Sequence, residues 1–425
     1  MKTIEIKNLL QHIGKRQTRN LVNLTLGRPL RMSNFKSMTL DWDDVKIANE
    51  WLSNRSSWKD ETVVSHYEAE FSQWNGSKYA FAFMAARVAL SACIYALDLQ
   101  PEDEVILPGY TCVVVPNAFK WAGVKTVYCD IELDTYGLDI NQIESKITSK
   151  TRAILLHHLY GIVCRDYEAI LDLAKRYKLK VIEDCAHTTG AEYRGRKVGN
   201  FGDVAIYSSE RSKVFNTIQG GVAVTNDNVL GKRLKEYYEQ APYPDELFID
   251  NQLSNILLEF YQFKHPQSWC IGDIYYCFNS HKKLFSTTEQ EEKGIRPAYY
   301  GQKMPAPIAA LGLNQLKKID YYSKCRRNNS QTWEKWCQEN GYKKPLVIDA
   351  SVPVYLFYPV IVESEIKKEV KWWGFKNFNV SVGDWFNTHI YPVPGRIPGC
   401  KNADIAVEQC INFPTLNHMC KFPGF

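Results

Sequence analysis

Two short segments of this chain carry side chains that could act together on one cofactor. Residues 181–187 read VIEDCAH and contain Asp184, and residues 208–213 read SSERSK and contain Ser208 and Lys213. A lysine amine holds the aldehyde of pyridoxal phosphate as a Schiff base, and a carboxylate keeps the ring nitrogen protonated so that the ring accepts electrons. The two segments therefore predict a pyridoxal phosphate site with Lys213 as its catalytic centre.

The elements around these segments predict a mostly parallel sheet covered on both faces, because short apolar strands alternate with helices of about ten residues. The expected strands are 79–84, 104–107, 125–128, 153–156, 180–182, 204–207 and 222–224, and the expected helices are 86–97, 113–122, 142–147 and 167–177. In such sheets the ligand lies at the carboxyl ends of the strands. Asp184 and Ser208 each follow a strand, so we expect them to meet at one site.

We expect three parts along the chain. Residues 1–60 are a polar lead-in with two helices, one around 42–53, and residues 61–305 form the large cofactor-binding domain. Residues 306–425 form a small C-terminal α+β domain, which starts with a helix over 306–319 and has strands at 354–358 and 380–382 around a helix near 363–373.

An aromatic-rich insertion at about 238–300 interrupts the large domain. We expect helices there that pack on the core or on a second subunit. A peripheral membrane contact is the alternative, because aromatic residues suit that interface.

Composition excludes several classes of protein. A net charge of +5 on 425 residues, with both signs interspersed, gives no reason to expect nucleic acid or a membrane surface as partner. No stretch approaches the ~18 apolar residues of a spanning helix. The 12 cysteines include no C-x-x-C pair, and Cys270 and Cys277 lack nearby histidines, so we expect free thiols in a reducing cytoplasm and no metal. No G-x-G-x-x-G follows the first strand, which argues against a Rossmann dehydrogenase.

From about Trp42 to Leu416 the chain resembles the DegT/DnrJ/EryC1/StrS family of pyridoxal phosphate-dependent sugar aminotransferases. The stretches that carry the resemblance are 101–111 (PEDEVILPGYT), 158–161 (HLYG), 182–187 (IEDCAH) and 220–227 (GGVAVTND). The order and spacing of these four stretches indicate the family more specifically than any single stretch does. The resemblance implies the α/β fold type I of aspartate aminotransferase, with a mostly parallel seven-stranded sheet, and a homodimer with its active site near the interface.

The resemblance also implies roles for four residues. Lys213 would hold the cofactor and then, once displaced by the substrate amine, move a proton between substrate and cofactor. Asp184 would pair with the ring nitrogen, His187 would lie near the phenolic oxygen, and Ser208 would bind the phosphate. The structural alternatives are a solvated lysine, a helix N-cap for Asp184 and a core histidine.

The chain departs from the family pattern at the phosphate and at the ring. Ala85, Ala86 and Arg87 stand where Gly-Thr or Gly-Ser opens the phosphate-binding helix, so we expect Ala86 and Arg87 at the phosphate, which a guanidinium can grip with two bonds. Cys112 stands where many members stack an aromatic ring, so either its sulfur packs on the cofactor or Tyr110 takes that role.

Two further positions match the family pattern only loosely. Many members send an asparagine from the neighbouring subunit to the phosphate, but this chain has none there, and Gln302 is the candidate substitute. His389, in THIYP, resembles a histidine of the small domain near the substrate, with a structural histidine as the alternative.

The leading hypothesis is an aminotransferase that moves an amino group from glutamate to a keto-sugar, most plausibly nucleotide-linked, in a ping-pong cycle. That activity would serve amino-sugar and polysaccharide biosynthesis. A different carbonyl acceptor is the first alternative, because Arg87, Cys112 and Trp385 depart from the common sugar enzymes. A deoxysugar dehydratase is disfavoured because those relatives carry histidine in place of Lys213. A non-catalytic regulatory or assembly protein with this fold is the third alternative.

Overall fold

The computed structural model describes residues 39–261, 275, 279, 282, 284, 286–297 and 300–416. Most of the lead-in, including its first expected helix, lies outside the described residues. So do Cys270, Cys277 and much of the aromatic-rich insertion.

A seven-stranded sheet forms the centre of the molecule, in the order β1-β10-β9-β6-β5-β2-β4. Its strands are β1 (Tyr79–Phe83), β2 (Glu104–Pro108), β4 (Lys125–Cys129), β5 (Thr151–His157), β6 (Lys180–Asp184), β9 (Val204–Ser208) and β10 (Gly221–Thr225). β10 runs antiparallel to both of its neighbours, and the other pairs are parallel. The expected α/β class with a mostly parallel, seven-stranded sheet is therefore confirmed.

Helices cover both faces of this sheet because successive strand residues point to opposite sides. Leu155 faces a core shared with α4 (Ala86–Ala96), α5 (Val114–Trp121) and α8 (Asn228–Gln240). Its neighbours Ile154 and Leu156 face a second core shared with α3 (Glu61–Asn75), α7 (Tyr167–Tyr177) and α12 (Ala306–Leu316). The runs of apolar residues in the central strands are thus explained by burial on both sides.

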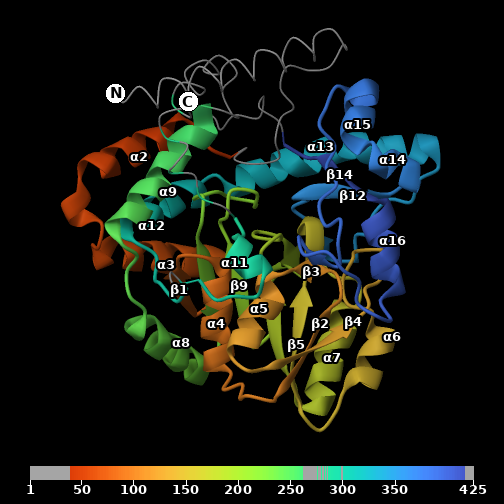
Figure 1. The fold of residues 1–425 in the computed structure, drawn as a ribbon, viewed down its shortest axis with the longest axis horizontal. Helices are drawn as coiled ribbons and strands as arrows, with labels where there is room; N and C mark the ends of the chain where they lie inside the picture. The colour runs from red at the N-terminus through yellow and green to blue at the C-terminus, as the bar shows by residue number, and fades with distance from the viewer. Residues whose placement is uncertain are drawn as a thin grey trace.

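The C-terminal elements gather at the end of the molecule that lies at the upper right of Figure 1. The long helix α13 (Ile319–Asn340) leads to them, and β12 (Phe357–Ile361) pairs antiparallel with β14 (Cys410–Pro414). The helices there are α14 (Ser364–Lys368), α15 (Val370–Phe378) and α16 (Lys401–Gln409).

Three expectations about this end need correction. The strand expected at 354–358 begins only at Phe357, because Tyr355 has left-handed backbone angles (φ 48°) that do not fit a strand. The helix expected near 363–373 is two helices, α14 and α15. The strand expected at 380–382 is wrong: only Gly383, which follows it, reaches the sheet, through one bridge to Asn412.

The described part of the lead-in packs on the large sheet domain. The expected helix is α2 (Trp42–Ser53), which lies against α12 and against α9 (Glu246–Glu259) of the insertion. The buried Lys318 amine is 2.8 Å from Asp44 and 3.6 Å from Asp41, and also pairs with Asp43, so the start of α2 is fixed to the α12–α13 junction.

Short elements complete the described chain. They are β3 (Thr111–Cys112), β7 (Glu192–Tyr193), β8 (Arg196–Lys197), β11 (Ser351–Val352), β13 (Ile390–Tyr391), α6 (Ile140–Ile143), α11 (Glu289–Glu292), η1 (Arg55–Ser57), η2 (Glu144–Lys146) and η3 (Leu159–Gly161). Within the ranges that the structure describes, no helix has the length and apolar character needed to cross a bilayer.

The start of β10 lies in very close contact with the start of α4. A Cβ atom added to Gly221 would lie 2.3 Å from the Ala86 nitrogen and 2.4 Å from the Ala86 Cα, both backbone atoms that cannot turn away. The absence of a side chain at Gly221 therefore allows the first turn of α4 to approach the sheet edge.

We predict that Gly221→Ala displaces the first turn of α4 and lowers the free energy of unfolding by about 1–3 kcal/mol, the usual cost of overpacking. Hydrogen exchange measured by mass spectrometry should become faster at residues 86–90. Gly76→Ala is the control, since a Cβ at Gly76 would meet nothing within 4 Å. Gly76→Ala should lower the free energy of unfolding only because alanine is unfavourable in the left-handed backbone conformation at this position. It should leave hydrogen exchange in α4 unchanged. Unchanged exchange in both variants would contradict the prediction.

Candidate active site

A cavity of about 710 Å³ opens at the carboxyl ends of β5, β6 and β9. The side chains expected at the cofactor line it together: Ala86, Arg87, Cys112, Asp184, His187, Ser208 and Lys213. The remaining wall comes from the segment 286–292 and from C-terminal residues near Trp385. Parallel strands that end at one edge of the sheet bring these distant parts of the chain to one place.

Lys213 lies in the loop that joins the antiparallel strands β9 and β10. The insertion helix α9 anchors this loop at two points. Glu259 pairs with the buried Arg211 at 2.5 Å, and the Gln252 amide donates to the Gln219 carbonyl at 2.6 Å. The insertion therefore helps to position the lysine.

His187 holds the Lys213 amine in a defined protonation state. The backbone N–H of Tyr160 donates to His187 Nδ1 at 3.2 Å, so the neutral ring carries its proton on Nε2. That nitrogen is 2.8 Å from Lys213 Nζ. A donor on Nε2 requires an acceptor opposite, which is the lone pair of an uncharged amine.

The pKa values of both groups move in the direction that this hydrogen bond requires. Burial lowers the pKa of Lys213, against the opposing charges of Glu210, Cys112 and Asp184. Burial and the Lys213 charge hold the pKa of His187 well below its ordinary value. The pair therefore favours a neutral imidazole beside a neutral, nucleophilic amine.

Asp184 is the last residue of β6, and its carboxylate faces the same cavity. Burial raises the pKa of Asp184, and the backbone N–H of Ala186, 3.0 Å from Oδ1, and the Lys213 charge partly offset that shift. A buried carboxylate is costly without a cation close by. A protonated ring nitrogen would supply that cation.

An anion would find donors in the same cavity, at the start of α4. Ala85 gives α4 no side-chain cap, so amide N–H groups at the start of this helix are available where Ala85, Ala86 and the Ser208 hydroxyl line the cavity. Together with the Lys213 amine and the Asp184 carboxylate, these donors fit the three parts of pyridoxal phosphate: phosphate, aldehyde and ring nitrogen.

Arg87 is engaged differently from the expectation. Its guanidinium forms a buried ion pair with Glu291 of α11 and donates to the Ser286 carbonyl. Asn117 binds the Glu291 carbonyl at 2.7 Å, and Trp121 binds the Gly294 carbonyl at 3.1 Å, so this segment is fixed to α5 as well. Arg87 lines the cavity, but in this structure its charge is paired with a carboxylate.

Three candidates for substrate contact do not lie in the cavity wall. Tyr110 is fully buried, and its hydroxyl donates to the Phe386 carbonyl at 3.1 Å. His389 is also fully buried, with Nε2 3.1 Å from Asp404 and Nδ1 accepting from the Ile397 N–H at 3.0 Å. The backbone carbonyl of Gln302 accepts from Met84, and its side-chain oxygen is buried without a hydrogen-bond partner.

Cys112 lies in the wall as expected, but no aromatic ring from its own segment joins it there, since Tyr110 is turned into the core. Instead, Trp385 from the C-terminal region stacks on His187 with ring centroids 4.8 Å apart. The sequence shows that Trp385 differs from the residue of the common sugar enzymes, but it does not show that the indole lies over Lys213. Glu210, between Ser208 and Lys213, is a second wall residue to which the sequence gave no role.

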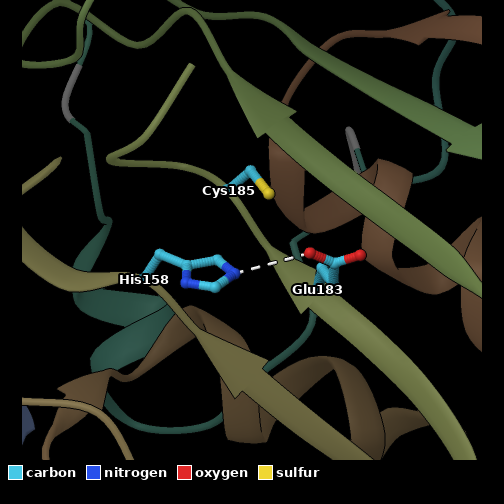
Figure 2. A group of neighbouring side chains, drawn as sticks. All are labelled: His158, Glu183 and Cys185. Carbon is cyan, nitrogen blue, oxygen red and sulfur yellow. Dashed lines mark hydrogen bonds and ion pairs between the residues drawn. The ribbon is translucent and has the colours of Figure 1, made fainter. Parts of the chain in front are cut away.

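His158, Glu183 and Cys185 form a buried group of metal-ligating types (Figure 2), of which His158 also lines the cavity. The Cys164 N–H donates to His158 Nδ1 at 3.1 Å, so Nε2 carries the proton and points at Glu183, 3.4 Å away. Glu183 also accepts N–H groups from Gly199 at 2.9 Å and Phe201 at 2.8 Å. The imidazole thus offers no lone pair to an ion here, and the group is a hydrogen-bond network.

Comparison with known proteins agrees with this geometry. The sequence matches the model of the DegT/DnrJ/EryC1/StrS aminotransferase family over residues 39–246 and 268–422. It is 37% identical over 194 residues to a GDP-perosamine synthase of Escherichia coli O157:H7, covering 46% of this chain and 52% of the relative. It is 34% identical over 189 residues to an L-glutamine:2-deoxy-scyllo-inosose aminotransferase of Streptomyces kanamyceticus, covering 43% of this chain and 44% of the relative. The chain spans about half the length of these curated relatives.

The fold resembles solved structures over nearly the whole chain. An aminotransferase from Psychrobacter cryohalolentis superposes with a TM-score of 0.69 at 22% identity, covering 91% of this chain and 95% of that structure.

We predict that His187→Ala raises the pKa of Lys213 in the cofactor-free protein, because it removes a donor to the neutral amine and admits water. Modification of Lys213 by trinitrobenzenesulfonate, followed by peptide mass spectrometry across pH, should shift its midpoint upward. His187→Gln keeps a donor near the same place and should give a smaller shift. An unchanged midpoint in His187→Ala would show that His187 does not set the state of the amine.

Proposed function

Because the chain belongs to the DegT/DnrJ/EryC1/StrS aminotransferase family, we propose that it is a pyridoxal phosphate-dependent aminotransferase. It takes an amino group from a donor, glutamate, and transfers it to a keto-sugar in a ping-pong cycle. One observation carries the proposal: the Lys213 amine, the Asp184 carboxylate and the start of α4 line one cavity at the strand ends.

When bound, the cofactor supplies an electron-accepting ring that stabilises negative charge on the substrate carbon. Lys213 holds the aldehyde and later carries a proton, tasks that need an uncharged amine at neutral pH. Asp184 holds the ring nitrogen in its protonated form. Ser208 and the backbone of Ala86 bind the phosphate, and Arg87 lies in the same wall with its charge paired to Glu291.

His187 and Cys112 complete the cofactor site in this proposal. The Nε2–H of His187, which donates to Lys213 in this structure, would be the donor to the phenolic oxygen. The Cys112 sulfur packs on the ring face that aromatic residues cover in many family members.

Two classes of compound are candidates for the acceptor, and the name of one relative supports each of them. A GDP-perosamine synthase among them favours a nucleotide-linked keto-sugar and a role in amino-sugar and polysaccharide biosynthesis. An inosose aminotransferase favours a free cyclic ketone, and its name gives glutamine as the donor. We propose the nucleotide-linked sugar first and the free cyclic ketone second.

We propose a division into a large domain to residue 305 and a small domain from residue 306, and a homodimer with the active site near the interface. Gln302 remains our candidate for a contact with the phosphate site of the partner subunit. We also propose a cytoplasmic location, because the buried cysteines of the described residues are free thiols, which persist in a reducing compartment: Cys93, Cys129, Cys164, Cys185, Cys337, Cys400 and Cys410.

We predict that the purified protein with pyridoxal phosphate absorbs near the visible edge and that Lys213→Ala abolishes this band. Amino transfer from glutamate or glutamine to a panel of cyclic ketones should fall by at least about 100-fold. Lys197→Ala, which removes another partly buried lysine, is the control and should retain both signals. A band without transfer to any acceptor would favour a non-catalytic protein with this fold.

We predict opposite effects of Asp184→Asn on activity and on stability. Amino transfer should fall by at least about 100-fold, because a neutral amide does not hold the ring nitrogen protonated. The cofactor-free protein should become more stable at neutral pH, because a buried charge is removed.

The pH dependence gives a sharper test. The raised pKa of Asp184 means that the folded protein binds the proton more tightly than the unfolded chain. The wild type therefore loses stability as the pH rises from the ordinary value of 3.8 through the raised pKa, and the asparagine variant does not. Calorimetry of both proteins across this range should show a difference that grows with pH. A wild type that is the more stable at neutral pH would contradict the assignment.

A further inference from the structure

The indole of Trp385 lies directly over the reactive lysine. Its ring centroid is 4.8 Å from Lys213 Nζ, and it stacks on the His187 ring at an interplanar angle of 27°. Phe357 packs edge-on against it at 5.3 Å. Trp385 comes from the C-terminal region, so this region supplies an aromatic wall to a site whose Asp184 and Lys213 come from the large sheet domain.

The segment that carries Trp385 is fixed by buried Asn412 of β14. The Asn412 side-chain oxygen accepts the backbone N–H of Trp385 at 2.8 Å. The backbones of Asn412 and Gly383 exchange two hydrogen bonds, both 2.9 Å long. These three bonds set the direction in which Trp385 leaves the backbone.

A pair of buried tyrosines holds the other side of the same segment. The Tyr110 hydroxyl donates to the Phe386 carbonyl at 3.1 Å, the Tyr160 hydroxyl donates to the Trp385 carbonyl at 3.5 Å, and the two hydroxyls lie 3.0 Å apart. Phe386 has left-handed backbone angles (φ 58°), as does Tyr160 (φ 56°). Such conformations cost about 1–3 kcal/mol each and persist only where the surroundings impose them. Tyr160 also binds His187, so one pair of tyrosines supports both stacked rings.

Any acceptor has to bring its carbonyl carbon within reach of Lys213 Nζ, because Lys213 moves the proton. At 4.8 Å from that atom, the indole leaves no space for a layer of water between itself and the acceptor. An acceptor that approaches Lys213 Nζ on the side of Trp385 therefore lies against the indole. A six-membered polyhydroxylated ring has flat C–H faces that match such a surface, whereas an open-chain keto acid does not. Ser381, Asp384 and Asn387 line the cavity beside the indole and can bind hydroxyl groups at the ring edge.

Resting on the proposed aminotransferase function, we propose that Trp385 is a specificity-determining residue: it selects cyclic polyhydroxylated ketones over open-chain ones by stacking on the ring. Tyr110 is a positioning residue in this arrangement, because it acts through the segment that bears Trp385.

The test compares Trp385→Ala and Trp385→Phe with Trp372→Ala, a tryptophan of the same region that does not line the cavity. The probes are 2-deoxy-scyllo-inosose, a nucleotide-linked ketohexose and open-chain 2-oxoglutarate, each assayed with enzyme already charged with an amino group. We expect Trp385→Ala to raise the KM for the cyclic ketones by about 10–100-fold, the range for a lost pocket contact. The KM for 2-oxoglutarate should change by less than about 3-fold, because it has no ring to stack.

Trp385→Phe should raise the KM for the cyclic ketones much less than Trp385→Ala does, and Trp372→Ala should have the KM values of the wild type. Tyr110→Phe should raise the same KM values by less, with kcat unchanged. Equal effects of Trp385→Ala on cyclic and open-chain acceptors, or none on either, would overturn the proposal.

A second readout does not need the loaded enzyme. In the cofactor-free protein, trinitrobenzenesulfonate should modify Lys213 faster in Trp385→Ala than in wild type, and Trp385→Phe should lie between them. Unchanged modification would show that the indole does not cover the lysine in solution and would overturn the proposal. If no protein transfers an amino group to any acceptor, the proposed function fails while this readout still tests the position of Trp385.

Discussion

The site depends on one buried carboxylate that does not line it. Glu183, fully buried in β6, accepts hydrogen bonds from His158 after β5, from the Tyr167 hydroxyl of α7, and from the backbone between β8 and β9. Burial alone would raise the pKa of Glu183, but bonds from His158, Tyr167 and the backbone hold it below its ordinary value. A carboxylate with this many donors stays charged in the core and draws the ends of neighbouring strands to fixed positions.

The next residue, Asp184, faces the opposite side of the strand and has the opposite environment. Burial raises its pKa, and few donors compensate. The two adjacent acids thus differ in environment: Glu183 is satisfied by hydrogen bonds from the protein, and Asp184 faces the cavity, where we propose that it pairs with a ligand cation. Environments that push neighbouring pKa values apart are typical of sites that carry out proton chemistry. The pKa of Lys213 is also shifted by its environment, because burial favours the neutral amine and His187 can donate a hydrogen bond to it.

The wall around these groups is assembled from three distant parts of the chain. The large sheet domain supplies Asp184 and Lys213, and the C-terminal region supplies Trp385. The end of the insertion supplies Ser286 and is held to Arg87 by the buried Glu291. Each part is fixed by buried hydrogen bonds or ion pairs. The cavity can therefore hold strained backbone at Tyr160 and Phe386, because the surrounding contacts leave these residues no alternative.

The sequence alone determined the sheet, its order of strands and helices, and the meeting of Asp184 and Lys213. These follow from local rules, because apolar runs define strands and parallel strands present their carboxyl ends at one edge. The tertiary structure alone decided that Arg87 pairs with Glu291, that Tyr110 and His389 turn into the core, and that Trp385 lies over Lys213. Side-chain directions in loops are set by partners far away in the chain, and neither spacing nor periodicity records those partners.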